Sequence, residues 1–257
     1  MLEIFSIYMT TFEQEKTIRV YLPKTYMNEN KRYPVLYMHD GQNVFRDEDS
    51  HRGVSLGIED YLDENGQEII VVGIDFNTAG EERINEYCPW PNGEMAKEKF
   101  GVTNLTGGRG EDYLDFIVHE LKPFIDRKYR TLDNITYMAG ISLGGLITTY
   151  AACHYPHIFK KIAILSPAFY RNQEEIENLL RTSDLSAFEG VYMDCGTSEA
   201  VEEEKISRLF LDSSKSVYEI ISELVPNTKF ETLDNAEHDY TFFRHRVPTI
   251  FNFLLKS

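Results

Sequence analysis

The sequence predicts an α/β fold whose central sheet has about eight strands, is mostly parallel and is covered by helices on both faces. Strand-like apolar runs recur along the chain, at residues 3–10, 17–23, 34–39, 68–75, 134–140, 160–166, 190–195 and 228–233. From residue 34 onward, helix-like segments separate most of these runs, and this alternation is typical of a parallel sheet. The first two runs follow each other without a helix, which predicts an antiparallel start to the sheet.

The composition is that of a globular protein with a large core. The chain has 257 residues, of which 42% are hydrophobic and 13% aromatic. It contains no internal repeat, low-complexity tract or obvious linker, so we expect residues 1–257 to form one domain.

Charge and cysteine content limit the partners and the compartment. The formal net charge of −16 repels polyanions, which argues against nucleic acid and anionic membranes as general partners. Three cysteines without C-x-x-C spacing (Cys88, Cys153 and Cys195) fit a reducing compartment. The first residues lack the basic and apolar segments of a signal peptide, and no apolar run reaches membrane-spanning length. We therefore expect a cytoplasmic protein with a small-molecule partner; the sequence does not indicate an oligomeric state.

One connection is much longer than the others. Roughly 35 residues, 77–110, separate the strand near Asp75 from the next helix, whereas α/β connections usually take about 2–6 residues. This connection carries Arg83, Tyr87, Phe100 and the single tryptophan, Trp90. We expect an ordered loop over the carboxyl ends of the strands, with Trp90 and Tyr87 lining a substrate site. The alternative is that Trp90 only anchors the loop to the core.

The most informative motif lies at residues 140–145, Gly-Ile-Ser-Leu-Gly-Gly. A strand-like run enters it and a helix-like run leaves it, which is the setting of a nucleophile elbow with Ser142 at its tip. Small residues are required two positions before and after the serine, and Gly140 and Gly144 supply them. The alternative is a glycine-rich turn whose serine only caps the helix. A Walker-type phosphate loop is excluded, because no Gly-Lys-Ser or Gly-Lys-Thr follows.

A serine nucleophile needs a general base, which in this topology follows the last strand. His238 lies in the loop after the strand at 228–233 and is the candidate. The remaining histidines fit less well, because His51 lies in a polar early loop and the others, apart from His39, fall on or near predicted helices.

Two carboxylates compete for the role of triad acid. Glu199 lies beyond the strand at 190–195, whereas Asp194 lies inside it. A carboxylate that orients the imidazole must reach it from the carboxyl edge of the sheet, which favours Glu199 and leaves Asp194 as the alternative. Glu199 could also be only an acid at a helix N-terminus.

Backbone amides are the expected oxyanion donors. The candidates are the amide of Leu143 and those of Gly41 and Gln42, which follow an early central strand. His39 and Asp40 invite a metal site, but no ligand cluster with metal spacing accompanies them, and no cofactor or metal is expected.

Five segments together resemble the putative esterase (esterase D-like) family of α/β-hydrolases: residues 38–45 (MHDGQNVF), 83–90 (RINEYCPW), 140–145 (GISLGG), 195–199 (CGTSE) and 237–239 (EHD). The resemblance covers nearly the whole chain in order. The family includes feruloyl and acetyl xylan esterases, siderophore esterases, S-formylglutathione hydrolases and mycolyltransferases. The resemblance implies a Ser-acid-His triad at Ser142, Glu199 and His238, although many members carry Asp where this chain has Glu199.

The sequence hypothesis is therefore a serine carboxylic-ester hydrolase that works through an acyl-enzyme. The short connection at about residues 168–190 predicts an open site without a large lid, which suits short-chain or small soluble acyl esters, including acylated sugars. Two alternatives remain: an acyltransferase that uses the same triad, and a noncatalytic binding module on the hydrolase scaffold.

Overall fold

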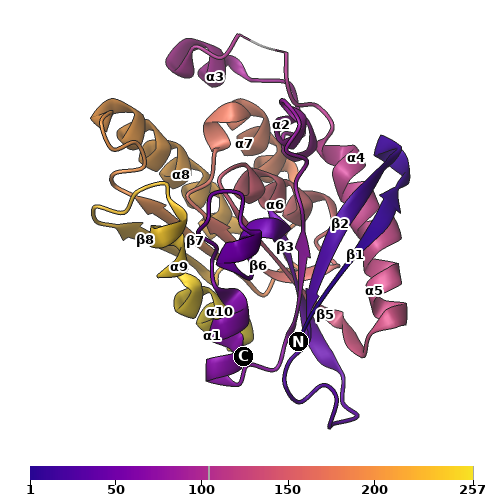
Figure 1. Cartoon of the computed structure of the whole chain (residues 1–257). Helices are drawn as coiled ribbons and strands as arrows, with labels where there is room; N and C mark the ends of the chain where they lie inside the picture. Colours follow the sequence, from indigo (N-terminus) through magenta and orange to yellow (C-terminus); the bar gives the residue numbers. More distant parts are fainter. Residues whose placement is uncertain (104, 257) are drawn as a thin grey trace.

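The computed structural model describes residues 1–103 and 105–256 and contains the expected eight-stranded sheet (Figure 1). Each predicted strand exists, with its bounds within a few residues of the expected ones. The strands are β1 (Leu2–Met9), β2 (Gln14–Tyr21), β3 (Tyr33–His39), β4 (Ile70–Ile74), β5 (Thr131–Ile141), β6 (Phe159–Leu165), β7 (Gly190–Gly196) and β8 (Thr228–Leu233).

The strand order is β1-β2-β4-β3-β5-β6-β7-β8. β1 pairs with β2 and β2 with β4 in antiparallel fashion, which confirms the expected antiparallel start. From β4 to β8 all neighbours are parallel. The carboxyl ends of these six strands therefore meet at one edge, where α/β sheets bind their ligands.

Alternate residues of each central strand belong to two separate hydrophobic cores. In β3, Val35 and Tyr37 pack in one core, while Leu36 and Met38 pack in the other. Successive side chains of a strand point to opposite faces, so a strand that is apolar throughout requires cover on both sides of the sheet.

Helices provide that cover and give the α/β-hydrolase architecture that the sequence predicts (Figure 1). The larger core is covered by α4 (Gly110–Asp115), a π-helical turn (Phe116–Leu121), α5 (Lys122–Lys128), α6 (Leu143–His154), α7 (Gln173–Thr182) and α8 (Glu204–Leu224). The smaller core is covered by α1 (Ile58–Asn65), α9 (Tyr240–Arg244) and α10 (Val247–Leu255).

The long connection between β4 and α4 is more regular than the expected loop. It contains two short helices, α2 (Glu82–Tyr87) and α3 (Glu94–Phe100), and an antiparallel bridge between Pro91 and Gly107. α3 ends at Gly101, whose φ of 64° is left-handed and therefore favours glycine. In Figure 1, α3 stands at the top, beyond the ends of the strands.

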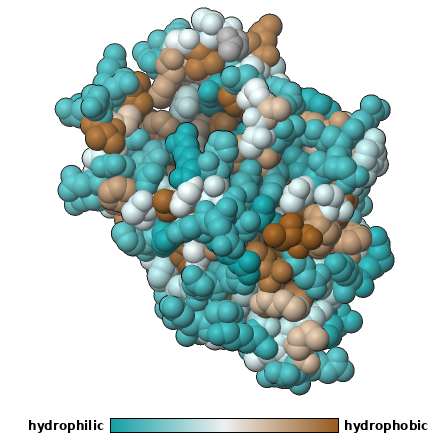
Figure 2. Space-filling model, viewed as in Figure 1, coloured by the Kyte–Doolittle hydropathy of each residue, from teal (hydrophilic) through white to brown (hydrophobic). Residues whose placement is uncertain are grey.

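Between β6 and β7 the structure has a single 3₁₀ turn (Phe169–Arg171) and α7, as the short connection predicts, and no large lid is present among the described residues. Figure 2 shows that hydrophilic residues cover most of the face viewed there. Within residues 1–103 and 105–256, no helix combines the length and the apolar character that crossing a membrane requires.

A buried ion pair fixes α2 against the antiparallel part of the sheet. Lys16 Nζ of β2 lies 2.6 Å from Glu86 Oε1 of α2, and the two side chains are 3% and 0% exposed. Gln14 Nε2 donates a second hydrogen bond to the same carboxylate oxygen, at 3.2 Å. Burial raises the pKa of Glu86, and the nearby lysine opposes that effect. Among the described residues, Lys16 is the one cation paired with the Glu86 carboxylate, so the position of α2 depends on this pair.

Replacing Lys16 with Met should destabilise the protein by about 3–5 kcal/mol, because it leaves the Glu86 carboxylate buried without its cation. The double variant Lys16→Met/Glu86→Leu should recover most of this loss, since apolar replacements of both partners of a buried pair are often neutral. Urea unfolding of the three proteins measures the difference. A Lys16→Met protein that unfolds at the wild-type denaturant concentration would show that the pair does not hold α2.

Candidate active site

Ser142 is the single residue between β5 and α6, and the chain turns sharply there. Its φ of 59° and ψ of −120° lie outside the regions that non-glycine residues ordinarily adopt. A Cβ added to Gly140 would lie 2.1 Å from the carbonyl oxygen of Gly144, so strand and helix touch through their backbones. The strand-turn-helix expected at residues 140–145 is present, with its serine in the strained conformation of a nucleophile elbow.

The start of α6 lies against the loop that follows β3. A Cβ on Gly144 would be 3.3 Å from His39 Cβ and 3.6 Å from Asp40 Oδ2. Gly41 begins a 3₁₀ turn, Gly41–Asn43, and a Cβ on it would come within 2.7 Å of the Gly73 backbone in β4. Leu143 and Gly41 are thus each the first residue of a helical turn, where amides have no acceptor within the turn. The expected amide donors lie on two neighbouring segments of one edge.

The loop after β3 is held by α2. Asp40 has a left-handed φ of 58°, and its carboxylate accepts hydrogen bonds from Arg83 Nε at 2.7 Å and Arg83 Nη2 at 2.8 Å. The Asp40 amide donates to the hydroxyl of Tyr87 at 3.1 Å. Arg83 and Tyr87 are four residues apart, so they project from the same side of the helix. Gln42 adds a two-point contact with the backbone of Phe76.

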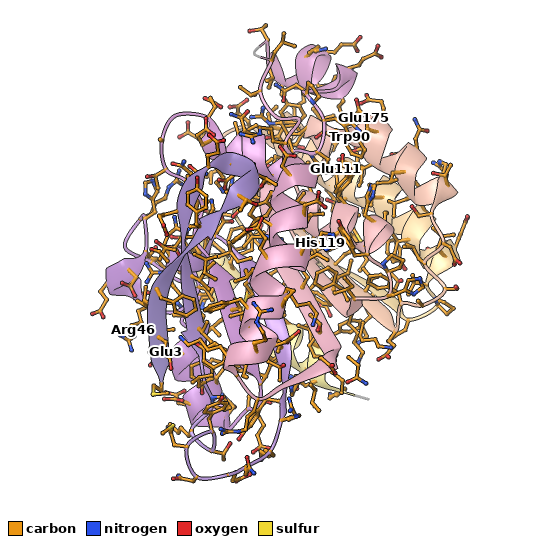
Figure 3. The ribbon with its side chains drawn as sticks, turned by 90° about the vertical axis from the view of Figure 1, so that its right-hand side faces the viewer. Glu3, Arg46, Trp90, Glu111, His119 and Glu175 are labelled. Atoms are coloured by element: carbon orange, nitrogen blue, oxygen red, sulfur yellow. The ribbon has the colours of Figure 1, made fainter. Side chains whose placement is uncertain are left out.

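Tyr87 and Trp90 do not line the cavity described below. Tyr87 has no exposed surface, because it packs beneath the loop after β3 and bonds to it. The expectation that Tyr87 lines a substrate site is therefore wrong. Trp90 packs edge-to-face on Tyr150 of α6, with ring centroids 5.2 Å apart, as an anchor would. Figure 3 shows Trp90 near Glu111 at the α3 end of the molecule and His119 further down the helical run.

His238 and Glu199 come together from the loops after β8 and β7. His238 Nδ1 lies 2.6 Å from Glu199 Oε2, and the glutamate side chain is completely buried. The backbones of the two segments are in close contact at Gly196, where an added Cβ would lie 2.2 Å from the carbonyl oxygen of Ala236. Only glycine therefore allows the two loops to approach closely enough for this contact.

Glu199 carries its charge in a buried position. Burial would raise the pKa of its carboxyl group, but hydrogen bonds from His238, the hydroxyl of Ser166 and the amide of Gly196 outweigh burial and lower the pKa. The Ser166 Oγ and Gly196 N donors both reach Glu199 Oε1, each at 2.5 Å. Both oxygens of the carboxylate are therefore used.

Asp194, the alternative acid, binds an arginine instead of the histidine. It is completely buried, and Arg246 Nη1 lies 2.7 Å from its Oδ1 atom. Burial raises the pKa of Asp194 to about 6, although Arg246 opposes that effect. Of the two carboxylates that the sequence left open, Glu199 is the one that contacts His238.

Ser142 and His238 share a cavity of about 380 Å³ at the carboxyl edge of the sheet. Its wall combines polar and charged groups with a few apolar side chains. The residues are Asp40, Asn43, His51, Arg52, Val54, Phe76, Arg83, Ile141, Ser142, His238, Asp239, Tyr240 and Phe243. Sequence reasoning missed most of this wall, because residues 51–54 and Tyr240 carry no motif and reach the site only through the fold.

His39 is buried and contacts a tyrosine hydroxyl. Its Nδ1 atom lies 2.9 Å from the hydroxyl of Tyr113, and burial lowers its pKa to about 4. Across residues 1–103 and 105–256, no three His, Cys, Asp or Glu side chains are grouped in a way that could hold a metal ion.

The chain is similar to known proteins in sequence and in fold. A family model described as "Putative esterase" matches residues 9–254. The chain is 29% identical to "Uncharacterized protein YbbA" of Bacillus subtilis (strain 168) over 214 residues, which covers 79% of this chain and 77% of the relative. Among solved structures, it resembles a ferulic acid esterase (TM-score 0.73, 18% identity, 99% and 97% of the two chains). It also resembles the siderophore hydrolase EstA from Aspergillus nidulans (TM-score 0.77, 16% identity, 98% and 94%).

Replacing Gly140 with Ala should destabilise the protein by about 3 kcal/mol or more, because the new methyl group meets backbone atoms that no side-chain rotation can move. Gly80 is the matched control: it has a φ of 51° and open space around it. Gly80→Ala should cost only the strain of a left-handed residue, about 1–2 kcal/mol. Chemical denaturation compares the two, and equal losses would contradict the close approach at the elbow.

Proposed function

Because the chain belongs to the putative esterase family and is a carboxylic ester hydrolase, we propose that it hydrolyses esters through an acyl-enzyme formed on Ser142. In this proposal His238 is the general base, and Glu199 orients it. The oxyanion is held by the amide of Leu143 together with those of Gly41 and Gln42.

The observation that carries the proposal is the 2.6 Å contact between His238 Nδ1 and Glu199 Oε2 beside the strained elbow. A buried, ionised carboxylate that accepts the Nδ1 proton leaves Nε2 of the imidazole as an acceptor. His238 lines a cavity whose wall also contains Ser142. A base, its orienting acid and a serine on a nucleophile elbow are the parts that acyl transfer requires.

In the first half of the reaction, Ser142 Oγ attacks the ester carbonyl while His238 takes its proton. The negative charge that develops on the carbonyl oxygen is stabilised by the amides of Leu143 and of Gly41 or Gln42. His238 then gives the proton to the alcohol oxygen, the carbon–oxygen bond to that alcohol breaks, and the acyl group stays on Ser142.

In the second half, water replaces the alcohol. His238 removes a proton from the water as it attacks the acyl-enzyme, and the same amides hold the oxyanion again. When the intermediate collapses, His238 returns the proton to Ser142 Oγ and the carboxylic acid leaves. Glu199 keeps the imidazole oriented and stabilises its cationic form in both halves.

The cavity supports small, water-soluble esters as substrates, acylated sugars included. A volume of about 380 Å³ lies near the lower end of the roughly 300–1,000 Å³ of ligand pockets. Its wall combines charged groups such as Arg52 and Asp239, which can hydrogen-bond to the polar part of a substrate, with apolar side chains such as Phe76 and Phe243. Two structural neighbours are named as a ferulic acid esterase and a siderophore hydrolase. Esters with aromatic acyl groups are therefore also worth testing.

The cysteines support a reducing compartment such as the cytoplasm. Cys88, Cys153 and Cys195 are all free, and burial raises the pKa of each thiol. Buried neutral thiols of this kind serve as packing groups and are poor nucleophiles.

The proposal is tested with p-nitrophenyl esters from acetate to decanoate, using wild type and Ser142→Ala side by side. We expect wild-type turnover to be highest with the short acyl groups. In Ser142→Ala it should fall at least about a thousandfold, because loss of the nucleophile leaves only binding and the oxyanion donors.

Ser222→Ala is the control for this experiment. The hydroxyl of Ser222 makes an exposed hydrogen bond to the carbonyl of Glu219 one turn earlier in α8, so its loss should leave turnover unchanged. A folded Ser142→Ala protein with wild-type turnover would overturn the proposed function. An acyl-enzyme that releases more alcohol when acceptor alcohols are added, without releasing more acid, would identify an acyltransferase instead.

A further inference from the structure

A buried chain of hydrogen bonds continues beyond the Glu199–His238 pair. Ser166 Oγ donates to Glu199 Oε1 at 2.5 Å, and Arg246 Nη1 donates to Ser166 Oγ at 2.7 Å. The same Nη1 atom lies 2.7 Å from Asp194 Oδ1. Ser166, Asp194 and Arg246 are 0%, 0% and 5% exposed. None of the three lines the cavity that contains Ser142.

We propose that Ser166 and Arg246 are positioning residues for Glu199, and through Glu199 for His238. This inference rests on the proposed function, because it assigns the two residues to the orientation of the general base. Asp194 takes part in the same series of hydrogen bonds, because its carboxylate holds Arg246 in place.

The direction of each hydrogen bond is fixed by the chemistry of the groups. An arginine nitrogen can only donate, so Arg246 Nη1 uses its two hydrogens on Ser166 Oγ and Asp194 Oδ1. Ser166 therefore receives a hydrogen bond from Arg246, and its own single proton is directed to Glu199. Arg246 thus turns a rotatable hydroxyl into a donor with one orientation.

This donor determines which oxygen of Glu199 faces His238. Oε1 accepts from Ser166 Oγ and from the amide of Gly196, both at 2.5 Å. Two donors on one oxygen hold the carboxylate group against rotation and leave Oε2 for the histidine, at 2.6 Å. Loss of the Ser166 donor would free the carboxylate to turn and would raise the pKa of Glu199, because that hydrogen bond is among the groups that lower it.

The backbone conformation of Ser166 places its hydroxyl where it can donate to Glu199. Its φ of 39° is positive, which is uncommon for serine, and its amide donates to the Asp194 carbonyl at 2.9 Å. The next residue, Pro167, packs on Gly145 at the start of α6, where an added Cβ would lie 3.0 Å from Pro167 Cβ. A conformation that is strained and tightly packed beside a reactive site is typical of a functional position.

Stability alone does not account for Arg246. Among the residues that the structure describes, its Nε and Nη2 atoms are buried without a hydrogen-bond partner. A buried guanidinium with unpaired donors lowers stability relative to an apolar side chain of similar size. Its Cζ atom lies 4.7 Å from the ring centroid of Phe243, and His238 packs on the same ring, with centroids 5.2 Å apart and nearly perpendicular planes. Arg246 therefore reaches the histidine through both Glu199 and Phe243.

The test compares Ser166→Ala with Ser213→Ala by steady-state kinetics. Both serines are buried and both hydroxyls donate to a side chain, but Ser213 donates to Gln173 of α7 and not to Glu199. We expect kcat of Ser166→Ala to fall about ten- to hundredfold with KM nearly unchanged, because misplacing a catalytic group by about 1 Å costs up to about 100-fold. Ser213→Ala should keep the wild-type kcat.

Two further readouts separate positioning from a general loss of structure. The acid limb of the pH profile of kcat/KM should move to lower pH in Ser166→Ala, because a carboxylate that can turn away from the imidazole stabilises the protonated histidine less. Arg246→Lys should lower kcat as well, and the double variant Ser166→Ala/Arg246→Lys should be no slower than the slower single variant, since both residues act through one carboxylate.

Independent, additive losses of kcat, or a Ser166→Ala protein with the wild-type kcat and pH profile, would overturn the positioning role. Ser142→Ala in the same assay keeps the two proposals apart. If Ser142→Ala is inactive while Ser166→Ala equals wild type, only the positioning role fails. If Ser142→Ala keeps wild-type turnover, the proposed function itself fails.

Discussion

Three close backbone approaches, each possible only at glycine, hold the functional edge of this sheet together. Gly140 lets β5 touch the start of α6, Gly41 lets the loop after β3 touch β4, and Gly196 lets the loop after β7 touch the loop after β8. Each contact joins two segments that carry different parts of the site. The serine, the amides and the histidine–glutamate pair therefore meet because the backbones approach more closely than side chains would allow.

Buried charge is organised around the same edge. Asp40 is paired with Arg83, Asp194 with Arg246 and Glu199 with His238, so each buried carboxylate has its own partner. The surrounding protein carries a formal net charge of −16, and unpaired carboxylates here would take up protons instead of ionising. Burial would raise the pKa of Glu199, but hydrogen bonds from His238, Ser166 and Gly196 lower it, which explains how its fully buried side chain stays ionised, as the orientation of a histidine base requires.

The sequence predicted the sheet well, because its strands are short apolar runs separated by helices and each run is buried on both faces. The candidates Ser142, Glu199 and His238 were chosen from their positions after β5, β7 and β8, which chain order alone indicates. The cavity wall could not be found in this way, because Arg52 and Tyr240 reach it through tertiary packing. Tyr87 was misassigned, because an aromatic residue in a long connection looks the same in sequence whether it faces a ligand or lies beneath a loop. The hydrogen bond between Ser166 and Glu199 joins residues 33 positions apart and has no sequence signal.

In the proposed mechanism, Ser142 is the residue that becomes acylated. The most direct measurement is to treat the protein with a fluorophosphonate, which phosphonylates activated serines, and to locate the adduct by mass spectrometry of the intact chain and its peptides. We expect one adduct per chain, on Ser142 in the peptide that contains Gly140 to Gly145, and slower labelling in His238→Ala. Adducts on another serine, or an active esterase that takes up no label at Ser142, would contradict it.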